Sequence, residues 1–214
     1  MGASVQQVEK LPSRKHSQPN DAPISTVLLK VSGALDEMGT EYGLIGGIAS
    51  SVLGRPRATS DIDVFVAPRD AKPVLAGLSE RGFETDRLDD QWIYKAKFED
   101  VVVDLIFSTR YGIYFDDEMK KHARSATFLG APVRVVSPED LLIIKAVAHD
   151  EATPRHWHDA LGLLTRSEFD WAYLLNRSRC ANRRVLSLLL YAQSLDIWIP
   201  DHVIRALVQR VCAS

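Results

Sequence analysis

Residues 46–66 read GGIASSVLGRPRATSDIDVFV, and this stretch decides the fold. Two glycines predict a turn, a short apolar segment predicts a helix over residues 48–53, and a loop with two arginines follows. The closing segment, Asp61–Val66, alternates at its start and then runs apolar, which is typical of a strand. The stretch therefore predicts a turn, a helix, a loop and a strand, with two acids at the start of the strand.

Asp61 and Asp63 are expected to lie side by side, because residues i and i+2 of a strand point to the same face. Ile62 and Val64 then occupy the opposite face. Two carboxylates at this spacing repel each other unless a positive charge stands between them. Mg²⁺ prefers carboxylate oxygens and substrate phosphates. We therefore predict that Asp61 and Asp63 hold a divalent cation.

A third acid, Asp104, stands in a similar setting. It interrupts the apolar run VVVDLIF at residues 101–107, which predicts another strand. A charge in such a strand is unfavourable unless it is paired or coordinated. If this strand lies beside Asp61–Val66, Asp104 completes a cluster of three carboxylates that can bind one or two metal ions.

The glycine turn offers a place for phosphate. The backbone N–H groups of Gly46 and Gly47 can approach a phosphate closely, and the N-terminus of the following helix favours negative charge. Hydroxyl and cationic groups that could assist follow directly in the sequence: Ser50 or Ser51, Arg55 and Arg57. Together with the acids, the turn indicates a nucleotide site.

Apolar spacing divides the chain into three parts. Residues 1–22 are polar and aperiodic, so we expect a mobile tail. Residues 23–136 mix predicted helices and strands, whereas residues 137–214 predict helices only. Ser137 and Pro138 supply a cap and a first turn for the first of these helices. The predicted fold is α/β (α+β): a mixed β-sheet core with flanking helices, followed by a C-terminal helical bundle.

The predicted elements have these bounds. In the core, helices are expected over residues 24–38, 48–53, 70–81 and 115–123, and strands over 42–45, 61–66, 91–97, 101–107, 125–128 and 133–136. In the C-terminal part, helices are expected over residues 138–149, 155–165, 168–178, 182–195 and 201–212. The boundary between the two parts is therefore expected between residues 136 and 137.

The ordered pattern of Gly46-Gly47, a helix, Asp61-x-Asp63 and a later strand aspartate, Asp104, resembles the nucleotidyltransferase superfamily. That superfamily includes DNA polymerase beta, the aminoglycoside nucleotidyltransferases and the minimal nucleotidyltransferases. The resemblance spans residues 25–165. The stretch 141–164 looks more specifically like the branch of the AbiEii-type toxin nucleotidyltransferases. Members of that branch carry a lysine on one helix and an aspartate on the next, at the positions of Lys145 and Asp159.

The resemblance implies both a mechanism and a set of residues. Asp61 and Asp63 would hold Mg²⁺, with Mn²⁺ as the alternative ion, and Asp104 would ligate a second metal or act as general base on the acceptor hydroxyl. The implied catalytic residues are Asp61, Asp63, Asp104 and Lys145, of which the three aspartates are also the implied metal ligands. The implied nucleotide-binding residues are Gly46, Gly47, Ser50, Arg57, Ser60 and Asp159.

The predicted function is therefore Mg²⁺-dependent transfer of a nucleoside monophosphate from an NTP, such as ATP, to a hydroxyl-bearing acceptor, with release of pyrophosphate. The acceptor could be RNA, with tRNA in the toxin-like branch, a protein side chain or a small molecule. The alternative is a non-catalytic nucleotide-binding or interaction module, one half of a toxin–antitoxin pair with an antitoxin protein as its partner. The presence of all three acids favours the enzyme.

Lys145 and Asp159 also have purely structural explanations. A lysine in an apolar helix can extend to solvent, and Asp159 can pair with Arg155 one turn earlier. His156 and His158 beside Asp159 suggest zinc, but residues i and i+2 of a helix do not face each other. The residue types therefore favour the nucleotide site over a zinc site.

Further basic and aromatic residues collect toward the C-terminus. A run of four arginines predicts either a solvated corner between helices or a patch for the phosphates of an RNA acceptor: Arg177, Arg179, Arg183 and Arg184. Three tryptophans are expected in the core or in grooves rather than as stacking platforms for bases: Trp157, Trp171 and Trp198.

The composition is that of an ordinary globular protein. The 214 residues are 46% hydrophobic and 25% charged, which excludes collagen, a coiled coil and a mostly disordered chain. The formal net charge of −2 excludes a global basic field. Cys180 and Cys212 are expected to be reduced thiols. No apolar run approaches the roughly 20 residues that cross a bilayer, and no signal peptide is visible, so we expect a soluble cytoplasmic protein without a membrane partner.

Overall fold

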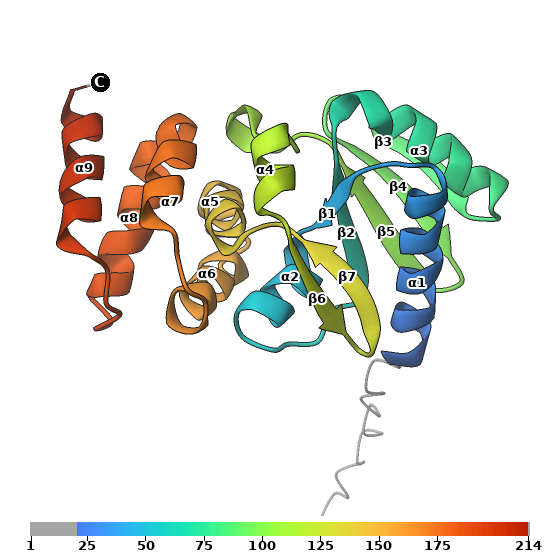
Figure 1. Ribbon diagram of the computed structural model, residues 1–214, viewed down its shortest axis with the longest axis horizontal. Helices are drawn as coiled ribbons and strands as arrows, with labels where there is room; N and C mark the ends of the chain where they lie inside the picture. The colour runs from blue at the N-terminus through green and yellow to red at the C-terminus, as the bar shows by residue number, and fades with distance from the viewer. Residues whose placement is uncertain (1–20, 214) are drawn as a thin grey trace, which may run out of the picture.

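The computed structural model describes residues 21–213, and its centre is a mixed seven-stranded sheet (Figure 1). The strand order is β3-β4-β5-β2-β1-β7-β6. The strands are β1 Tyr42–Leu44, β2 Asp61–Val66, β3 Glu84–Asp89, β4 Ile93–Phe98, β5 Val101–Ile106, β6 Arg124–Phe128 and β7 Ala131–Val135. β2 pairs with β5 in parallel and β1 with β7 in parallel, while the other neighbours are antiparallel. This confirms the expected mixed sheet.

Helices cover both faces of this sheet. α1 (Asp21–Glu37) and α3 (Pro68–Glu80) pack on the face that receives Ile62 and Val64, which are 0% and 1% exposed (Figure 1). The other helices lie on the opposite face or continue beyond it: α2 Gly46–Leu53, η1 Arg110–Gly112, α4 Asp117–His122, α5 Pro138–Ala148, α6 Arg155–Arg166, α7 Trp171–Arg177, η2 Ser178–Ala181, α8 Asn182–Gln193 and α9 Asp201–Cys212. The face that carries Asp61 and Asp63 is therefore the one turned toward α5.

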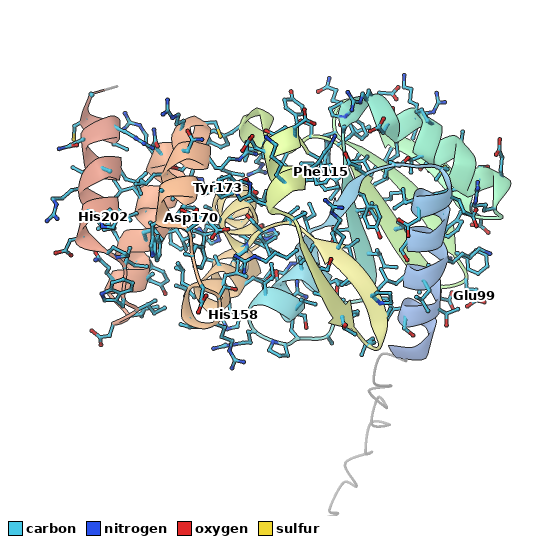
Figure 2. The ribbon with its side chains drawn as sticks, in the orientation of Figure 1. Glu99, Phe115, His158, Asp170, Tyr173 and His202 are labelled. Carbon is cyan, nitrogen blue, oxygen red and sulfur yellow. The ribbon has the colours of Figure 1, made fainter. Side chains whose placement is uncertain are left out.

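α5 joins the sheet to the C-terminal helices, and nearly all its residues are buried. It starts as predicted, because Ser137 Oγ accepts the Asp140 N–H at 3.1 Å. Its buried acid Asp140 accepts from the Tyr173 hydroxyl at 2.8 Å and from Arg177 Nε at 3.0 Å (Figure 2 labels Tyr173 at this junction). A buried carboxylate needs such partners, and here they fix α7 against α5.

Several predicted bounds differ from the structure. β3 was not predicted, because its sequence ETDRLD has no apolar alternation and it lies exposed at the edge of the sheet. α2 begins at Gly46, so the expected turn is the first part of the helix itself. The helix expected from residue 168 begins at Trp171, because Asp170 Oδ1 caps it by accepting the Tyr173 N–H at 2.9 Å.

The predicted division into parts can be placed on these elements. The expected tail, residues 1–22, lies outside the described residues except for Asp21 and Ala22, which begin α1. The predicted boundary at residues 136 and 137 falls between the end of β7 and the start of α5. Buried apolar side chains from both parts form one contiguous cluster, so their independence as domains stays a prediction.

The remaining expectations concern the surface and the thiols. Cys180 and Cys212 are exposed free thiols, as expected. None of the helices between residues 21 and 213 combines the length and the apolar character that crossing a membrane requires. Trp198 is 75% exposed and meets Trp171 edge-on, whereas Trp157 is partly buried against the core.

Candidate active site

Three aspartates, which we call the acid cluster, lie together on one face of the sheet. In the parallel pairing of β2 with β5, Asp63 stands directly opposite Asp104. Asp61 lies on the same face as Asp63 because the two residues are two positions apart on β2, with only Ile62 between them. One carboxylate oxygen from each of Asp61, Asp63 and Asp104 lies within 4.8 Å of the other two. Among the residues 21–213, this is the one group of three or more His, Cys, Asp and Glu side chains with that geometry.

The acid cluster lacks enough positive charge to balance it. Burial raises the pKa of Asp63 to about 6, and the negative charges of Asp61 and Asp104 act in the same direction. The Gly47 N–H, 3.4 Å from Asp63 Oδ2, opposes this rise. An all-oxygen, negatively charged cluster suits Mg²⁺ or Mn²⁺ better than zinc, which prefers nitrogen and sulfur ligands. The acid cluster therefore fits a divalent cation.

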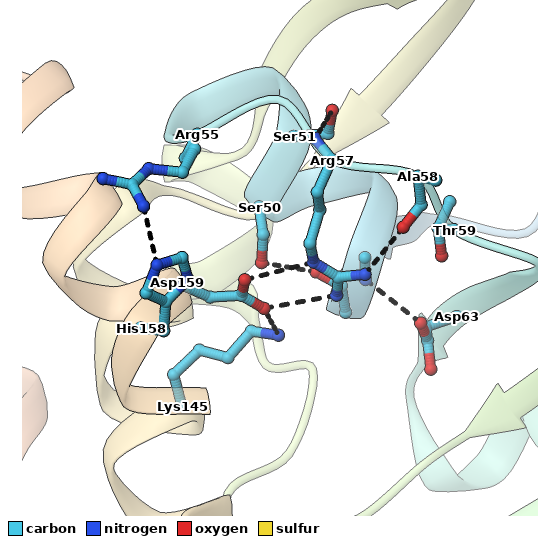
Figure 3. Close-up of polar contacts among 12 residues, drawn as sticks. Ser50, Ser51, Arg55, Arg57, Ala58, Thr59, Asp63, Lys145, His158 and Asp159 are labelled. Atoms are coloured by element: carbon cyan, nitrogen blue, oxygen red, sulfur yellow. Dashed lines mark hydrogen bonds and ion pairs between the residues drawn. The ribbon is translucent and has the colours of Figure 1, made fainter. Parts of the chain in front are cut away.

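The two glycines of α2 border the acid cluster, and the structure requires glycine at both positions. Gly46 has φ of +61°, and a Cβ there would lie 1.8 Å from Asp63 Oδ2. A Cβ at Gly47 would lie 2.2 Å from Thr59 Oγ1. Because these residues carry no side chains, the Gly47 N–H near the start of α2 lies beside Asp63, whose side chain Figure 3 shows. A phosphate at this helix N-terminus would find a favourable dipole and the Gly47 N–H, whose contact with Asp63 is long at 3.4 Å.

The serines predicted for the nucleotide site lie in different surroundings. Ser50 is 1% exposed, and its hydroxyl donates to the Gly46 carbonyl at 2.6 Å, one turn earlier in α2. Ser51 Oγ accepts the Arg57 N–H at 3.4 Å, and Ser60 is exposed next to β2. The nucleotide-binding roles of Ser50 and Ser60 stay predictions. Sequence reasoning missed Thr59, whose hydroxyl donates to Asp61 Oδ1 at 2.8 Å and so orients that acid.

Arg57, Lys145 and Asp159 form a second group, which we call the cationic cluster (Figure 3). Lys145 Nζ lies 2.9 Å from Asp159 Oδ2, and both side chains are 3% exposed. Arg57 Nε and Nη2 reach the two oxygens of the same carboxylate at 3.1 and 3.2 Å. Lys145 therefore does not extend to solvent, and Asp159 binds Lys145 and Arg57. One carboxylate thus holds two cations, and the cationic cluster keeps a net positive charge.

Burial and neighbouring charges together lower the pKa values of both Asp159 and Lys145. Burial favours a higher pKa for Asp159, but Lys145 and Arg57 outweigh it and hold the pKa below its usual range. Burial lowers the pKa of Lys145, while Asp159 and Asp63 act in the opposite direction. The interaction with Asp63 means that the cationic cluster is within electrostatic reach of the acid cluster. The two clusters together present cations and carboxylates to one site.

The histidines on α6 do not form a metal site. His158 Nε2 lies 2.6 Å from Arg55 Nη1, while Asp159 points to Lys145 and Arg57 (Figure 3). Burial lowers the pKa of His156 to about 4, and Lys145 contributes to the same shift. The disfavoured zinc alternative therefore gains no support from the placement of these side chains.

The predicted arginine patch is divided between internal and exposed positions. Arg177 pairs with Asp140 at 3.0 Å and with Asp116 at 2.7 Å, and the Arg184 guanidinium donates to the His149 carbonyl. Arg179 and Arg183 are exposed. Two of the four arginines thus hold helices together, which leaves a smaller basic surface than the sequence suggested.

Lys95 is a charged neighbour of the acid cluster that sequence reasoning missed. It stands opposite Asp104 in the antiparallel pairing of β4 with β5, and its Nζ lies 2.5 Å from Asp104 Oδ1. Lys95 and Lys97 alternate along the strand predicted at 91–97, which places them on one face. That alternation and the neighbouring strand predicted at residues 101–107 were the available signals, but the register that places Lys95 opposite Asp104 was not worked out from them.

This geometry defines a class: a mixed α/β fold in which a glycine-led helix faces a DxD strand and a third aspartate on the next strand. The model of the protein family described as "Uncharacterised nucleotidyltransferase" matches residues 32–195. The chain belongs to this family and is a nucleotidyltransferase, an enzyme. The resemblance to the nucleotidyltransferase superfamily is thereby confirmed, whereas membership of the AbiEii-type branch is not.

Solved structures show the same fold. A crystal structure of ANT(2")-Ia in complex with adenylyl-2"-tobramycin is 19% identical with a TM-score of 0.54, and the match covers 80% of this chain and 98% of that one. A solution structure of the antibiotic-resistance factor ANT(2'')-Ia is 19% identical with a TM-score of 0.56, and the match covers 81% and 93%. A comparison with curated protein sequences gives no match.

Proposed function

We propose that this nucleotidyltransferase transfers a nucleoside monophosphate from an NTP to a hydroxyl group of an acceptor, with release of pyrophosphate and with Mg²⁺ or Mn²⁺ as cofactor. One observation carries the proposal. The acid cluster borders Gly46 and Gly47 of α2, and Arg57 of the cationic cluster lies beside Gly47, where its Nη2 would be 3.2 Å from a Cβ. Such a site offers oxygen ligands for a cation and donors for phosphates side by side.

The acid cluster is the proposed holder of the cation. Asp61, Asp63 and Asp104 supply only oxygen atoms, and their mutual repulsion leaves Asp63 with a raised pKa of about 6. A divalent cation bound there would coordinate phosphate oxygens of the NTP and stabilise the negative charge on the reacting phosphoryl group. Thr59 orients Asp61, and the Gly47 N–H contacts Asp63, so the ligands are positioned before the substrate binds.

The α2 glycines and the cationic cluster are proposed to hold the triphosphate. The N–H groups of Gly46 and Gly47 would donate to its phosphate oxygens. Lys145 and Arg57 would attract the negative charge, and Asp159 positions both of them. These groups act by orientation and charge, which are the main contributions to rate in phosphoryl chemistry.

Asp104 is proposed to act as general base toward the acceptor. The acceptor hydroxyl would give its proton to the carboxylate while its oxygen bonds to the α-phosphorus. The bond between the α-phosphorus and the bridging oxygen breaks, and pyrophosphate leaves. Asp104 lies at the side of the acid cluster away from Gly47, because β5 is beyond β2 in the strand order. The acceptor would therefore approach from the β4–β5 side.

The class of acceptor stays open between a small molecule, RNA such as tRNA, and a protein side chain. The structurally similar ANT(2")-Ia was solved with adenylyl-2"-tobramycin, which makes a small-molecule hydroxyl a reasonable first choice. Arg177 and Arg184 are engaged internally, which weakens the case for an RNA patch on that surface. A role beside an antitoxin would require a partner protein and is best judged by the same experiment.

The test uses each of the four NTPs labelled at the α-phosphate, incubated with the full-length protein, Mg²⁺ and a cell extract. The products are separated into RNA, protein and small molecules. We expect label in one fraction, and we expect no label with the double variant Asp61→Ala plus Asp63→Ala. The variant Asp86→Ala, which removes an exposed acid of β3, should behave like the wild type.

Two results would contradict the proposal. Transfer that survives the double substitution would show that the acid cluster is not the site. Absence of transfer, together with calorimetric binding of Mg²⁺–NTP, would favour the alternative of a nucleotide-binding module without catalysis.

A further inference from the structure

The position of Lys95 limits how many cations the acid cluster can hold. Across the sheet, Lys95 on β4 stands opposite Asp104 on β5, and Asp104 stands opposite Asp63 on β2. The order along this row is therefore ammonium, carboxylate, carboxylate. Asp63 in turn contacts the Gly47 N–H. Lys95 thus lies at the end of the row that is farthest from the proposed phosphate donors.

Lys95 has two acidic neighbours in register, and its choice between them is informative. Asp86 stands opposite Lys95 on β3, and Asp104 stands opposite it on β5. Within residues 21–213 the ion pair of Lys95 forms with Asp104, at 2.5 Å. The Asp104 side chain is 16% exposed and the Lys95 side chain 37%, so the carboxylate end of the pair is partly shielded from water while the lysine reaches it from the surface. The ammonium is directed into the acid cluster.

A second divalent cation would have to share the Asp104 carboxylate with the Lys95 ammonium. Two-metal sites place their ions about 3.5–4 Å apart and need carboxylates that reach both of them. Asp104 is the one member of the acid cluster on the acceptor side, and its Oδ1 already binds the ammonium. A divalent ion on that oxygen would meet the positive charge of Lys95 at short range. Three carboxylates are neutralised in full by one divalent cation together with one ammonium.

We propose that the Lys95 ammonium takes the place of a second metal ion, so that the acid cluster binds a single divalent cation and Asp104 stays directed toward the acceptor. This inference rests on the proposed metal-dependent transfer, and it deepens that proposal by fixing the number of ions and by giving Lys95 a positioning role. Lys95 keeps the Asp104 carboxylate directed toward the acceptor, whereas a second metal ion would bind that carboxylate as a ligand.

Titration with Mn²⁺ tests the number of ions directly. Free Mn²⁺ is measured by electron paramagnetic resonance, with the full-length protein alone and with one equivalent of α,β-methylene-ATP. Ions are counted per protein–nucleotide complex without subtraction, because the proposed cation contacts both the acid cluster and the phosphates. We expect one Mn²⁺ per wild-type chain. In Lys95→Met we expect a second Mn²⁺, bound at least about tenfold more tightly than any second ion in the wild type.

Two further variants separate charge from structure. Lys97→Met removes a lysine from the same strand, two residues away and exposed, and should bind one ion as the wild type does. Lys95→Arg keeps the positive charge and should also bind one ion. Circular dichroism on each variant shows whether the fold is retained, and the arginine variant keeps the test decisive if the methionine variant does not fold.

The outcomes distinguish a failure of the role of Lys95 from a failure of the proposed metal-dependent transfer. Two ions of similar affinity in the wild type, two ions in Lys95→Arg, or one ion in a folded Lys95→Met would overturn the role of Lys95 and leave the proposed transfer standing. No Mn²⁺ bound by the wild type under either condition would instead contradict the proposed metal-dependent function.

Discussion

The acid cluster and the cationic cluster carry opposite net charge, and they differ in how far their charged groups are paired within the protein. In the cationic cluster, both oxygens of Asp159 are bound by its two cationic partners, Lys145 and Arg57. In the acid cluster, three carboxylates share one site, and burial with mutual repulsion raises the pKa of Asp63 to about 6. Every charged group of the cationic cluster therefore has a partner of opposite charge in the protein, whereas the acid cluster has more negative charge than its protein neighbours balance.

This difference separates a cluster that ties elements of the fold together from a cluster that we propose is completed by a bound cation. A buried ion pair with good geometry ties elements together, and here it joins α5, α6 and the loop before β2. Carboxylates that are gathered without enough counter-charge destabilise the protein until a cation arrives, and natural proteins retain such arrangements mainly at functional sites. Substitutions in the two clusters should therefore change stability in opposite directions.

The largest effect should come from the acid cluster and should appear in activity. Asp63→Asn removes a proposed cation ligand, so we expect nucleotidyl transfer to fall by at least about 10³-fold. The measurement is label transfer from an α-labelled NTP. Asp86→Asn, on exposed β3, is the matched control. If the Asp63→Asn variant keeps activity within a few-fold of the wild type, the chemistry takes place elsewhere.

The cationic cluster should show the next effect, in stability. Asp159→Ala leaves Lys145 buried without its carboxylate, and breaking a buried pair in this way destabilises by about 3–5 kcal/mol. Urea unfolding gives the free energy directly. Glu151→Ala removes an exposed acid near the same helix and should change it by less than about 0.5 kcal/mol. Equal losses in the two variants would show that the ion pair contributes little.

The pH dependence of stability should reveal Asp63. Its folded pKa of about 6 lies above the ordinary value of 3.8, so the folded state binds this proton more strongly than the unfolded state. Stability from this group is therefore lower at neutral pH and rises as the pH falls from about 6 toward 4, by about 2 kcal/mol. The difference in unfolding free energy between wild type and Asp63→Asn, measured without metal at each pH, isolates this contribution. A difference that stays constant between pH 7 and pH 4 would contradict it.

The smallest effect should come from the glycine that borders the acids. Gly46→Ala combines an unfavourable positive φ with a Cβ 1.8 Å from Asp63 Oδ2, whereas Gly82→Ala has φ of +85° and open space around the new Cβ. Both variants carry about 1 kcal/mol of backbone strain. The free energy of unfolding of Gly46→Ala should fall by about 1 kcal/mol more than that of Gly82→Ala, because Asp63 must move. Thermal unfolding compares the two. Equal losses would mean that Asp63 moves away without strain.

The sequence was sufficient for the parts of this account that depend on periodicity and local chemistry. The period of two brought Asp61 and Asp63 to one face, the lone acid in an apolar run predicted the place of Asp104, and Ser137 predicted the start of α5. Each of these inferences needs only the residues within one element or its immediate neighbour.

Contacts between separate helices, strands and loops explain what was missed. The partner of Asp159 is Arg57, 102 positions away, and no local pattern connects them. Lys95 became relevant only once β4 was known to pair with β5 in the register that places it opposite Asp104. β3 escaped prediction because its exposed, polar sequence owes its strand conformation to pairing with β4 rather than to its own alternation.

The central claim is that the acid cluster is a cation site which destabilises the protein until it is filled. The most direct test compares the melting temperatures of wild type and Asp63→Asn at pH 7.5, first in a chelator and then with increasing Mg²⁺ or Mn²⁺. In the chelator, Asp63→Asn is expected to have the higher melting temperature. The ion should raise the melting temperature of the wild type and have little effect on that of Asp63→Asn. The difference between the two melting temperatures should then become smaller or change sign. A wild type that is the more stable protein in the chelator, and that does not respond to either ion, would contradict the claim.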